Sequence, residues 1–134
     1  MHPKGKTAQE FLKQLEEATS GLLFPSETDA PLTPYAWPGD AEPTPEALLQ
    51  AAGKPAETKV ETTTVDDFFS GVVEPVEGGI EESEASRYRA VVALLNELSE
   101  LRVYRVGGPD FAVTILGRHA SGAWLGLQTH VVET

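Results

Sequence analysis

Apolar side chains recur at helical spacing in two segments of the chain. The first follows Thr7 and Glu10, which have the spacing of a capping box, and it ends at Gly21. It therefore predicts a helix over about residues 7–20. The second predicts the longest helix, over about residues 83–101, with acids in its first turns as the helix dipole favours. The apolar face of this second helix consists of Ala85, Tyr88, Val91, Val92, Leu95, Leu98 and Leu101.

The chain between these helices predicts shorter elements. Residues 44–53 begin with Thr-Pro-Glu and end in Gly, a pattern typical of the two ends of a helix. The β-branched stretch 59–65 predicts a strand, and Asp66 is expected to cap a short helix over residues 67–69. Residues 21–45 contain six of the ten prolines, which excludes a long helix, yet they also carry large apolar side chains. This irregular segment is therefore expected to pack onto the core.

Alternating apolar and polar residues predict three strands late in the sequence, over 102–106, 111–116 and 123–132. The short connections between them are typical of hairpins, so the strands are expected to form an antiparallel meander. One face of the last strand would carry Leu125, Leu127, Thr129 and Val131. Together these elements predict a single α/β (α+β) domain over residues 1–134. Because helices lie at both ends of a mixed, largely antiparallel sheet that ends in the meander, the expected fold is an α/β sandwich.

Composition and charge narrow the class of protein. The 134 residues include no cysteine, and no signal peptide or membrane-spanning apolar run is visible, so we expect a cytoplasmic protein. Residues 27–84 contain 14 acids and two bases, a net charge of −12, whereas the rest contains seven acids and eight bases, a net charge of +1. Nucleic acid is a poor partner for such a surface, because its binding relies on Lys and Arg. A basic protein is the better partner, and solubility alone is the simpler explanation.

The usual sequence signatures of enzymes are absent, so we expect neither catalysis nor a cofactor. The three histidines are His2, His119 and His130. His119 lies in a predicted turn and His130 on a predicted strand, and both are expected to be exposed or hydrogen-bonded rather than zinc ligands. The adjacent acids Asp66 and Asp67 are expected to serve the start of a helix rather than acid–base chemistry.

Two segments stand out as candidate binding elements. In GLLFPSE (21–27), a rigid loop anchored by apolar residues would present the Glu27 carboxylate as a preorganised anion for a basic phosphate site. These residues fit equally a loop in which Ser26 and Glu27 satisfy nearby backbone donors. At the other end of the sequence, Glu133 and Thr134 would emerge from a paired strand and offer hard oxygen donors of the kind that Mg²⁺ accepts.

Six short motifs follow one another along nearly the whole chain. They are GLLFPSE (21–27), Trp37-Pro38-Gly39, VDDFFS (65–70), VYRVG (103–107), ILG (115–117) and the final VVET (131–134). In this order and spacing they resemble the nuclease A inhibitor family, whose members inhibit a sugar-non-specific endonuclease with a ββα-metal active site. The resemblance implies an α-β-α sandwich, no catalysis, and a nuclease as the partner.

The resemblance also implies roles for individual residues. In the family, the glutamate of the first motif imitates the scissile phosphate in the nuclease active site, and that position is Glu27 here. The last threonine, Thr134 here, is implied to place its hydroxyl on the Mg²⁺ of the nuclease, while the free inhibitor binds no metal. A further family contact uses an acid followed by Trp. The matching pair is Glu77-Gly78, so the aromatic anchor is missing, which implies weaker affinity for the original nuclease or a different cognate enzyme.

The expected partner-binding surface therefore consists of Ser26, Glu27, Glu77, Glu133 and Thr134. The protein is expected to be a monomer when free and to bind neither nucleic acid nor a membrane. Two alternatives are open. One is an acidic adaptor for another basic protein, which the glycine at position 78 favours. The other is a small enzyme that uses Glu27 with His119 or His130.

Overall fold

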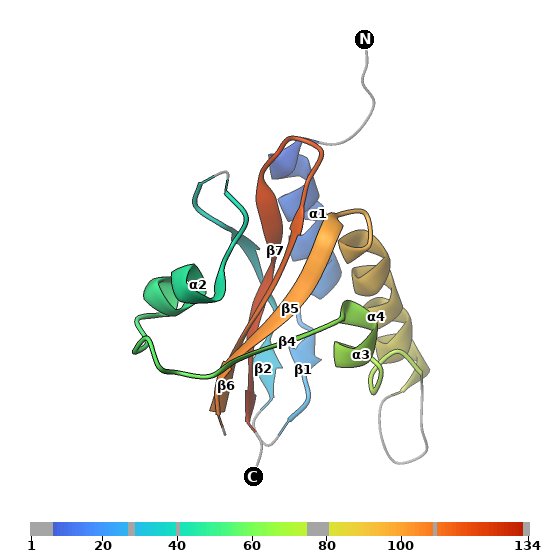
Figure 1. Cartoon of the computed structure of the whole chain (residues 1–134). Coiled ribbons are helices and arrows are strands. Elements are labelled where there is room, and N and C mark those ends of the chain that lie inside the picture. Colours follow the sequence, from blue (N-terminus) through green and yellow to red (C-terminus); the bar gives the residue numbers. More distant parts are fainter. Residues whose placement is uncertain (1–6, 27–28, 40, 75–80, 109, 133–134) are drawn as a thin grey trace.

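The computed structural model describes residues 7–26, 29–39, 41–74, 81–108 and 110–132. Within these ranges the chain forms four helices and seven strands (Figure 1). The helices are α1 (Ala8–Thr19), α2 (Pro45–Ala52), α3 (Val65–Phe68) and α4 (Glu82–Leu95). The strands are β1 (Leu23–Phe24), β2 (Ala30–Pro31), β3 (Thr33–Ala36), β4 (Val60–Thr63), β5 (Ser99–Gly107), β6 (Asp110–Arg118) and β7 (Trp124–Val132). None of the described helices is long and apolar enough to cross a membrane.

Five strands form one sheet in the order β3-β7-β6-β5-β4, and β1 and β2 form a separate two-stranded ribbon. The predicted meander is confirmed, because β5, β6 and β7 are antiparallel neighbours, with β6 and β7 paired from Asp110↔Val132 to Arg118↔Trp124. Each pairing among the described strands is antiparallel. The predicted α+β class and the largely antiparallel sheet are therefore confirmed, while the parallel pairs of a mixed sheet are not found among these strands.

Helices cover the two faces of the sheet unequally (Figure 1). α1, α3 and α4 pack on one face, here called the main face, where their buried side chains meet Ile115 and Leu127. α2 packs on the other face, here called the α2 face, where Leu48 meets Tyr104 and Leu116. The three layers match the predicted α-β-α sandwich. The residues predicted to share one face of the last strand are all buried: Leu125, Leu127, Thr129 and Val131.

Helices α1 and α2 begin and end close to where they were predicted, because their capping residues are the expected ones. Thr7 and Glu10 form the capping box, with hydrogen bonds of 2.8 and 3.1 Å. At α2 the Thr44 hydroxyl accepts the Ala47 backbone N–H at 3.1 Å, and Gly53 ends the helix with a φ of 69°. Glycine adopts this left-handed backbone at little steric cost, since it has no Cβ.

Two predicted boundaries on the main face are wrong. The cap of α3 is Thr64 rather than Asp66, because the Thr64 hydroxyl accepts a backbone N–H of the first turn at 3.1 Å. The long helix ends at Leu95, earlier than predicted. The apolar pattern continues through Leu98 because that side chain is also buried in the core. The chain pairs with β6 at Ser99 and again from Arg102, however, and sheet pairing overrides the local helical pattern.

Candidate functional site

The first candidate segment forms the connection of a short hairpin. β1 and β2 pair at two positions, so residues 25–29 join the two strands of the ribbon. Ser26 lies in this connection and is half-buried. Glu27 falls in the same connection by its place in the sequence, but it lies outside the described residues. The predicted loop is thus the tip of a ribbon that lies beside β7 (Figure 1).

An aromatic cluster holds this hairpin on the main face. The Phe24 ring stacks on Phe68 with centroids 4.5 Å apart, and it meets Phe69 edge-on at 5.8 Å. The Tyr88 ring is edge-on to Phe24 at 6.4 Å, and the Tyr88 hydroxyl donates a hydrogen bond to the Leu23 carbonyl. Such aromatic pairs contribute beyond the apolar area that they bury. Two of the six motifs, GLLFPSE and VDDFFS, are therefore in direct contact.

Burial changes the acidity of the tyrosine in this cluster. Loss of water around Tyr88 raises the pKa of its hydroxyl to about 12, with the carboxylates of Glu84 and Asp29 acting in the same direction and Arg87 opposing them. The phenol is therefore protonated at neutral pH. It can act as a permanent hydrogen-bond donor to the hairpin.

Arg87 of α4 fixes the chain just before the hairpin. Its guanidinium donates to the carbonyl oxygens of Ala18 at 3.1 Å and Ser20 at 2.6 Å, where α1 ends. The last carbonyls of a helix lack partners within the helix, and a cation there also complements the helix dipole. Arg87 thus ties α4 to the end of α1, from which the chain continues into the hairpin.

A hydrogen bond joins the hairpin to the end of the last strand. The Ser26 hydroxyl accepts the backbone N–H of Val132 at 3.2 Å, across 106 positions of sequence. Glu27, Glu133 and Thr134 lie outside the described residues. Ser26 immediately precedes Glu27, however, and Val132 comes two residues before the end of the sequence. The structure therefore brings together the residues that flank both candidate elements.

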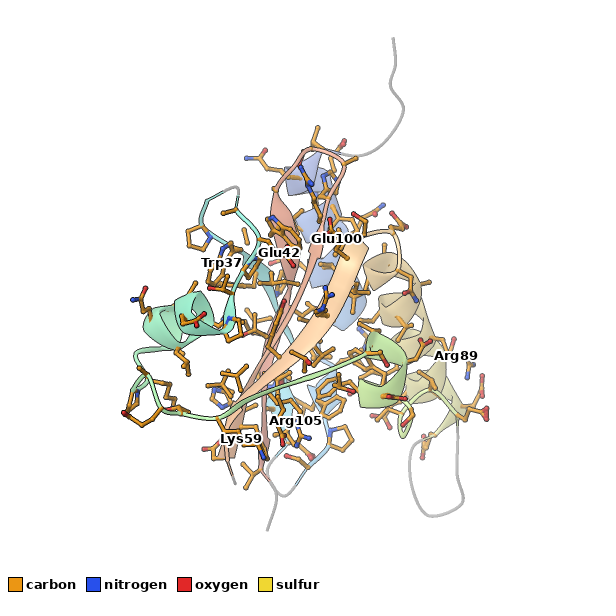
Figure 2. The ribbon with its side chains drawn as sticks, in the orientation of Figure 1. Trp37, Glu42, Lys59, Arg89, Glu100 and Arg105 are labelled. Carbon is orange, nitrogen blue, oxygen red and sulfur yellow. The ribbon has the colours of Figure 1, made fainter. Side chains whose placement is uncertain are left out.

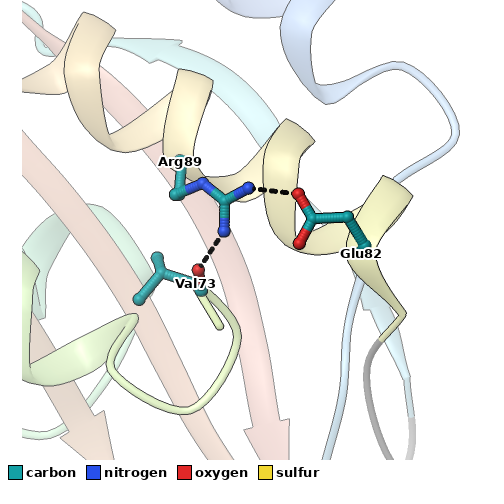
Figure 3. Close-up of polar contacts among 3 residues, drawn as sticks. All are labelled: Val73, Glu82 and Arg89. Atoms are coloured by element: carbon teal, nitrogen blue, oxygen red, sulfur yellow. Dashed lines mark hydrogen bonds and ion pairs between the residues drawn. The ribbon is translucent and has the colours of Figure 1, made fainter. Parts of the chain in front are cut away.

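A second arginine of α4 contacts residues on both sides of the acidic segment 74–81, which precedes this helix in the sequence. Figure 3 shows the Arg89 guanidinium donating to the Val73 carbonyl at 2.7 Å and to the Glu82 carboxylate at 2.6 Å. Glu77, the third candidate contact, falls between these two residues together with Gly78 and lies outside the described residues. The contacts of Arg89 thus fix the chain on either side of the segment that contains Glu77.

Bases near the end of the sheet where β7 stops are paired with an acid. Figure 2 shows Lys59 and Arg105 at this end of the sheet. Glu61 lies between them, with ion-pair distances of 3.2 Å to Lys59 and 3.9 Å to Arg105. The Arg105 guanidinium also lies over the Phe111 ring, 4.1 Å from its centroid. These partly exposed pairs contribute little to stability, but the Glu61 carboxylate offsets the positive charge of the two bases.

The two described histidines lie at opposite ends of the sheet. His119 is in the turn between β6 and β7, where its Nδ1 accepts the Ser121 backbone N–H at 3.1 Å. His130 Nδ1 lies 3.4 Å from Asp110 Oδ1, near the last residue pair of the same two strands. Both are hydrogen-bonded side chains, as predicted, and they do not share a site. In the part of the chain that the structure describes, no group of three or more histidine, aspartate or glutamate side chains is placed to hold a metal ion.

Sequence reasoning missed the residues that hold the hairpin in place. The pattern predicts Tyr88 only as part of an apolar helix face, and it singles out neither Arg87 nor Arg89. A tyrosine within an otherwise aliphatic face is a usable signal, because its buried hydroxyl requires a partner. The arginines carry no comparable signal, because the sequence does not indicate which carbonyls lie opposite them.

Comparison with known proteins places this arrangement in a family. A search of the curated proteins found no match. The family model described as nuclease A inhibitor-like protein matches residues 9–134, a range that includes the hairpin, the aromatic cluster and β7. The chain belongs to the family of nuclease A inhibitor-like proteins.

Proposed function

We propose that this protein inhibits a sugar-non-specific nuclease of the ββα-metal type by inserting the hairpin connection and the end of β7 into its active site. Membership of the nuclease A inhibitor-like family supports a nuclease as the partner. The observation that carries the proposal is the hydrogen bond of 3.2 Å between the Ser26 hydroxyl and the Val132 backbone N–H. It joins the segments that lead into Glu27 and Thr134, so a single cleft can receive both.

Covalent geometry limits how far the two acting residues can lie from this hydrogen bond. Adjacent Cα atoms are about 3.8 Å apart, so the Cα of Glu27 is within about 4 Å of that of Ser26. By the same reasoning, the Cα of Thr134 is within about 7 Å of that of Val132. Both residues are therefore tethered close to this hydrogen bond, which is compatible with a single cleft that holds a metal ion beside the phosphate of the substrate.

In the proposed complex each oxygen group has a distinct role. The Glu27 carboxylate takes the place of the phosphate among the cations of the nuclease. The Thr134 hydroxyl, a hard oxygen donor, binds the Mg²⁺ that the nuclease supplies, so the inhibitor needs no metal of its own. Because the hairpin is already anchored by the buried rings around Phe24, little conformational entropy is lost on binding.

The acidic surface extends the proposed site. Glu77 and Glu133 add negative charge around the two acting groups, and the net charge of −12 over residues 27–84 complements a cleft built to hold nucleic acid. Such complementarity can raise association rates toward about 10⁸ M⁻¹s⁻¹ at low salt. In this proposal the protein acts in the cytoplasm as a monomer and binds no nucleic acid itself.

Titration of a panel of metal-dependent, non-specific nucleases with the purified protein tests the proposal. The wild type is expected to inhibit at least one enzyme of the ββα-metal class. Glu27→Gln should raise the inhibition constant at least about thirtyfold, as expected for a hot spot worth about 2 kcal/mol. Glu46→Gln is the matched control, because it removes the same charge from an exposed position on α2. It should change the constant by less than about threefold.

Extra residues placed after Thr134 supply a second test. They should weaken inhibition to a similar extent, because they displace the hydroxyl from the metal. If Glu27→Gln and Glu46→Gln had equal effects and the extension had none, inhibition would depend on overall charge and the proposed mechanism would be wrong. If no nuclease were inhibited and a different basic protein were captured, the acidic-adaptor hypothesis would be favoured instead.

A further inference from the structure

We infer that Ser26 is a positioning residue, whose hydroxyl holds the end of β7 against the hairpin so that the two elements bind the nuclease as one unit. This inference rests on the proposed function. It also changes the role expected for Ser26, from a contact with the partner to a support within the inhibitor. Two features support this inference: the strands that lie beside β7, and the contacts that anchor the hairpin.

Only part of β7 is flanked on both sides by strands of the five-stranded sheet. On one side, β6 accompanies it as far as Val132, which pairs with Asp110. On the other side, β3 pairs with β7 only from Leu125 to Gln128. β2 directly precedes β3 in the chain, both strands of the β1–β2 ribbon contact β7, and the hairpin connection reaches Val132 through Ser26. The last residues of β7 therefore depend on the ribbon for contacts on this side.

Ser26 supplies a hydrogen-bond acceptor at this place. Its Oγ accepts the Val132 N–H at 3.2 Å, and the contact is partly shielded from solvent. A partly buried N–H that loses its acceptor is unfavourable, because water does not fully replace the lost bond. The Ser26 hydroxyl thus takes the place that a strand carbonyl would have if β3 continued.

Ser26 can act as a support because the chain before it is fixed. Two residues earlier, the Phe24 ring is buried among the rings of α3 and α4. The main face thereby sets the position of the Ser26 hydroxyl. The hydrogen bond to Val132 in turn fixes the end of β7. Glu27 and Thr134 would then keep a constant separation, as two groups that address one active site require.

Amide hydrogen exchange in the free protein tests the support. Ser26→Ala should speed exchange at the Val132 amide by about tenfold or more, and the Leu127 amide in the middle of β7 should be unchanged. Ser26→Thr, which keeps the hydroxyl, should restore the protection. Ser99→Ala is the matched control, because it removes a hydroxyl that donates to the Arg118 carbonyl at the opposite end of the sheet. Unchanged exchange at Val132 in Ser26→Ala would overturn the inference.

A double-mutant cycle on inhibition tests the coupling. Ser26→Ala alone should raise the inhibition constant by about tenfold. In a variant that lacks Thr134 the same change should have little further effect, because the end of β7 no longer carries a group to position. Additive losses would overturn the inference and make Ser26 a direct contact with the nuclease. If the wild type inhibited no nuclease, the proposed function would fail and the coupling with it, whereas the exchange result would stand as a property of the fold.

Discussion

The two faces of the sheet differ in how much they bury and in what they support. On the main face, three helices enclose one continuous core that contains the fully buried rings of Phe69 and Tyr88. On the α2 face, the buried cluster among the described residues consists of Leu48, Tyr104 and Leu116. The hairpin of the candidate site packs into the larger core through Phe24. The helices of the main face therefore support the candidate site, whereas α2 adds to the stability of the domain.

The rigidity of the candidate site originates on the main face. The described contacts that tie the hairpin to the helices come from the main face, through the rings of α3 and α4 and through the Tyr88 hydroxyl. The Arg87 guanidinium of the same face holds the chain just before the hairpin, at Ser20. Substitutions that disrupt packing on the main face should therefore lower both the free energy of unfolding and the strength of inhibition. Substitutions that disrupt packing on the α2 face should lower the free energy of unfolding alone.

Phe24→Ala should have the largest effect. Removing a buried ring from a packed core typically costs about 3–5 kcal/mol, and this ring contacts both α3 and α4. We expect the free energy of unfolding, measured in urea, to fall by about that much. Inhibition should also weaken at a temperature where the variant is still folded. Phe24→Leu, which keeps much of the apolar volume, should lose less in both measurements. If Phe24→Ala were destabilised but inhibited like the wild type, packing on the main face would not control inhibition.

Leu48→Ala tests the other face. Leu48 is buried, but few buried side chains surround it, so the loss in unfolding free energy should be about 2–3 kcal/mol, near the low end for leucine. The inhibition constant of the folded variant should equal that of the wild type, because α2 lies on the face away from the aromatic cluster. If Leu48→Ala weakened inhibition as much as Phe24→Ala, the distinction between the two faces would be lost.

Elements whose signals are local were predictable from the sequence. The capping box of α1 and the Thr-Pro start of α2 each lie within one element, and each is confirmed. The alternation along β7 is confirmed from Leu127 to Val131, whereas the strand is buried on both faces from Trp124 to Leu127. Strands β1, β2 and β3 were not predicted, because prolines such as Pro31 and Pro34 argue against a central strand. They form where a missing N–H is tolerated, in a two-stranded ribbon and at the edge of the sheet.

For the candidate site, the sequence indicates the two segments but not the contact between them. No pattern within residues 21–27 or 131–134 indicates that Ser26 accepts a hydrogen bond from Val132, because the two are 106 positions apart. Likewise, the stack of Phe24 on Phe68 exists only because α3 packs beside the hairpin. Such pairings are properties of the whole fold, so periodicity and capping signals do not contain them.

Tyr88→Phe should have an intermediate effect that depends on pH. At about pH 8, loss of the hydrogen bond to the Leu23 carbonyl should cost about 1–2 kcal/mol of unfolding free energy. Folding raises the pKa of Tyr88 to about 12, whereas the pKa of an unfolded tyrosine is about 10. The contribution of the phenol is therefore complete below about pH 10 and is lost as the pH rises through about 12, because the unfolded chain releases its proton first.

The informative quantity is the difference in unfolding free energy between the wild type and Tyr88→Phe across this pH range. Burial also raises the pKa values of Tyr35 and Tyr104, but these groups titrate in both proteins and cancel in the difference. The cost of the substitution should shrink above about pH 10, by up to about 2 kcal/mol. A difference that stayed constant with pH would show that Tyr88 is not the buried donor that supports the hairpin.

The smallest effects should come from a matched pair of helix caps, one on each face. Thr64 caps α3 and Thr44 caps α2, and each hydroxyl accepts a backbone N–H at 3.1 Å. Replacing either threonine by alanine should cost about 1 kcal/mol of unfolding free energy, because one N–H of the first turn loses its acceptor. The two variants are therefore matched in stability and differ in the face that they loosen.

Inhibition should separate these two variants. Thr64→Ala loosens the start of α3, whose Phe68 stacks on Phe24 beneath the hairpin, so the inhibition constant should rise by about threefold, a fraction of the 1 kcal/mol lost from stability. Thr44→Ala should leave the constant unchanged, because the change lies on the α2 face. Equal inhibition constants for the two variants, measured where both are fully folded, would mean that the hairpin does not take its rigidity from α3. Both faces would then have to be treated as equal supports of the site.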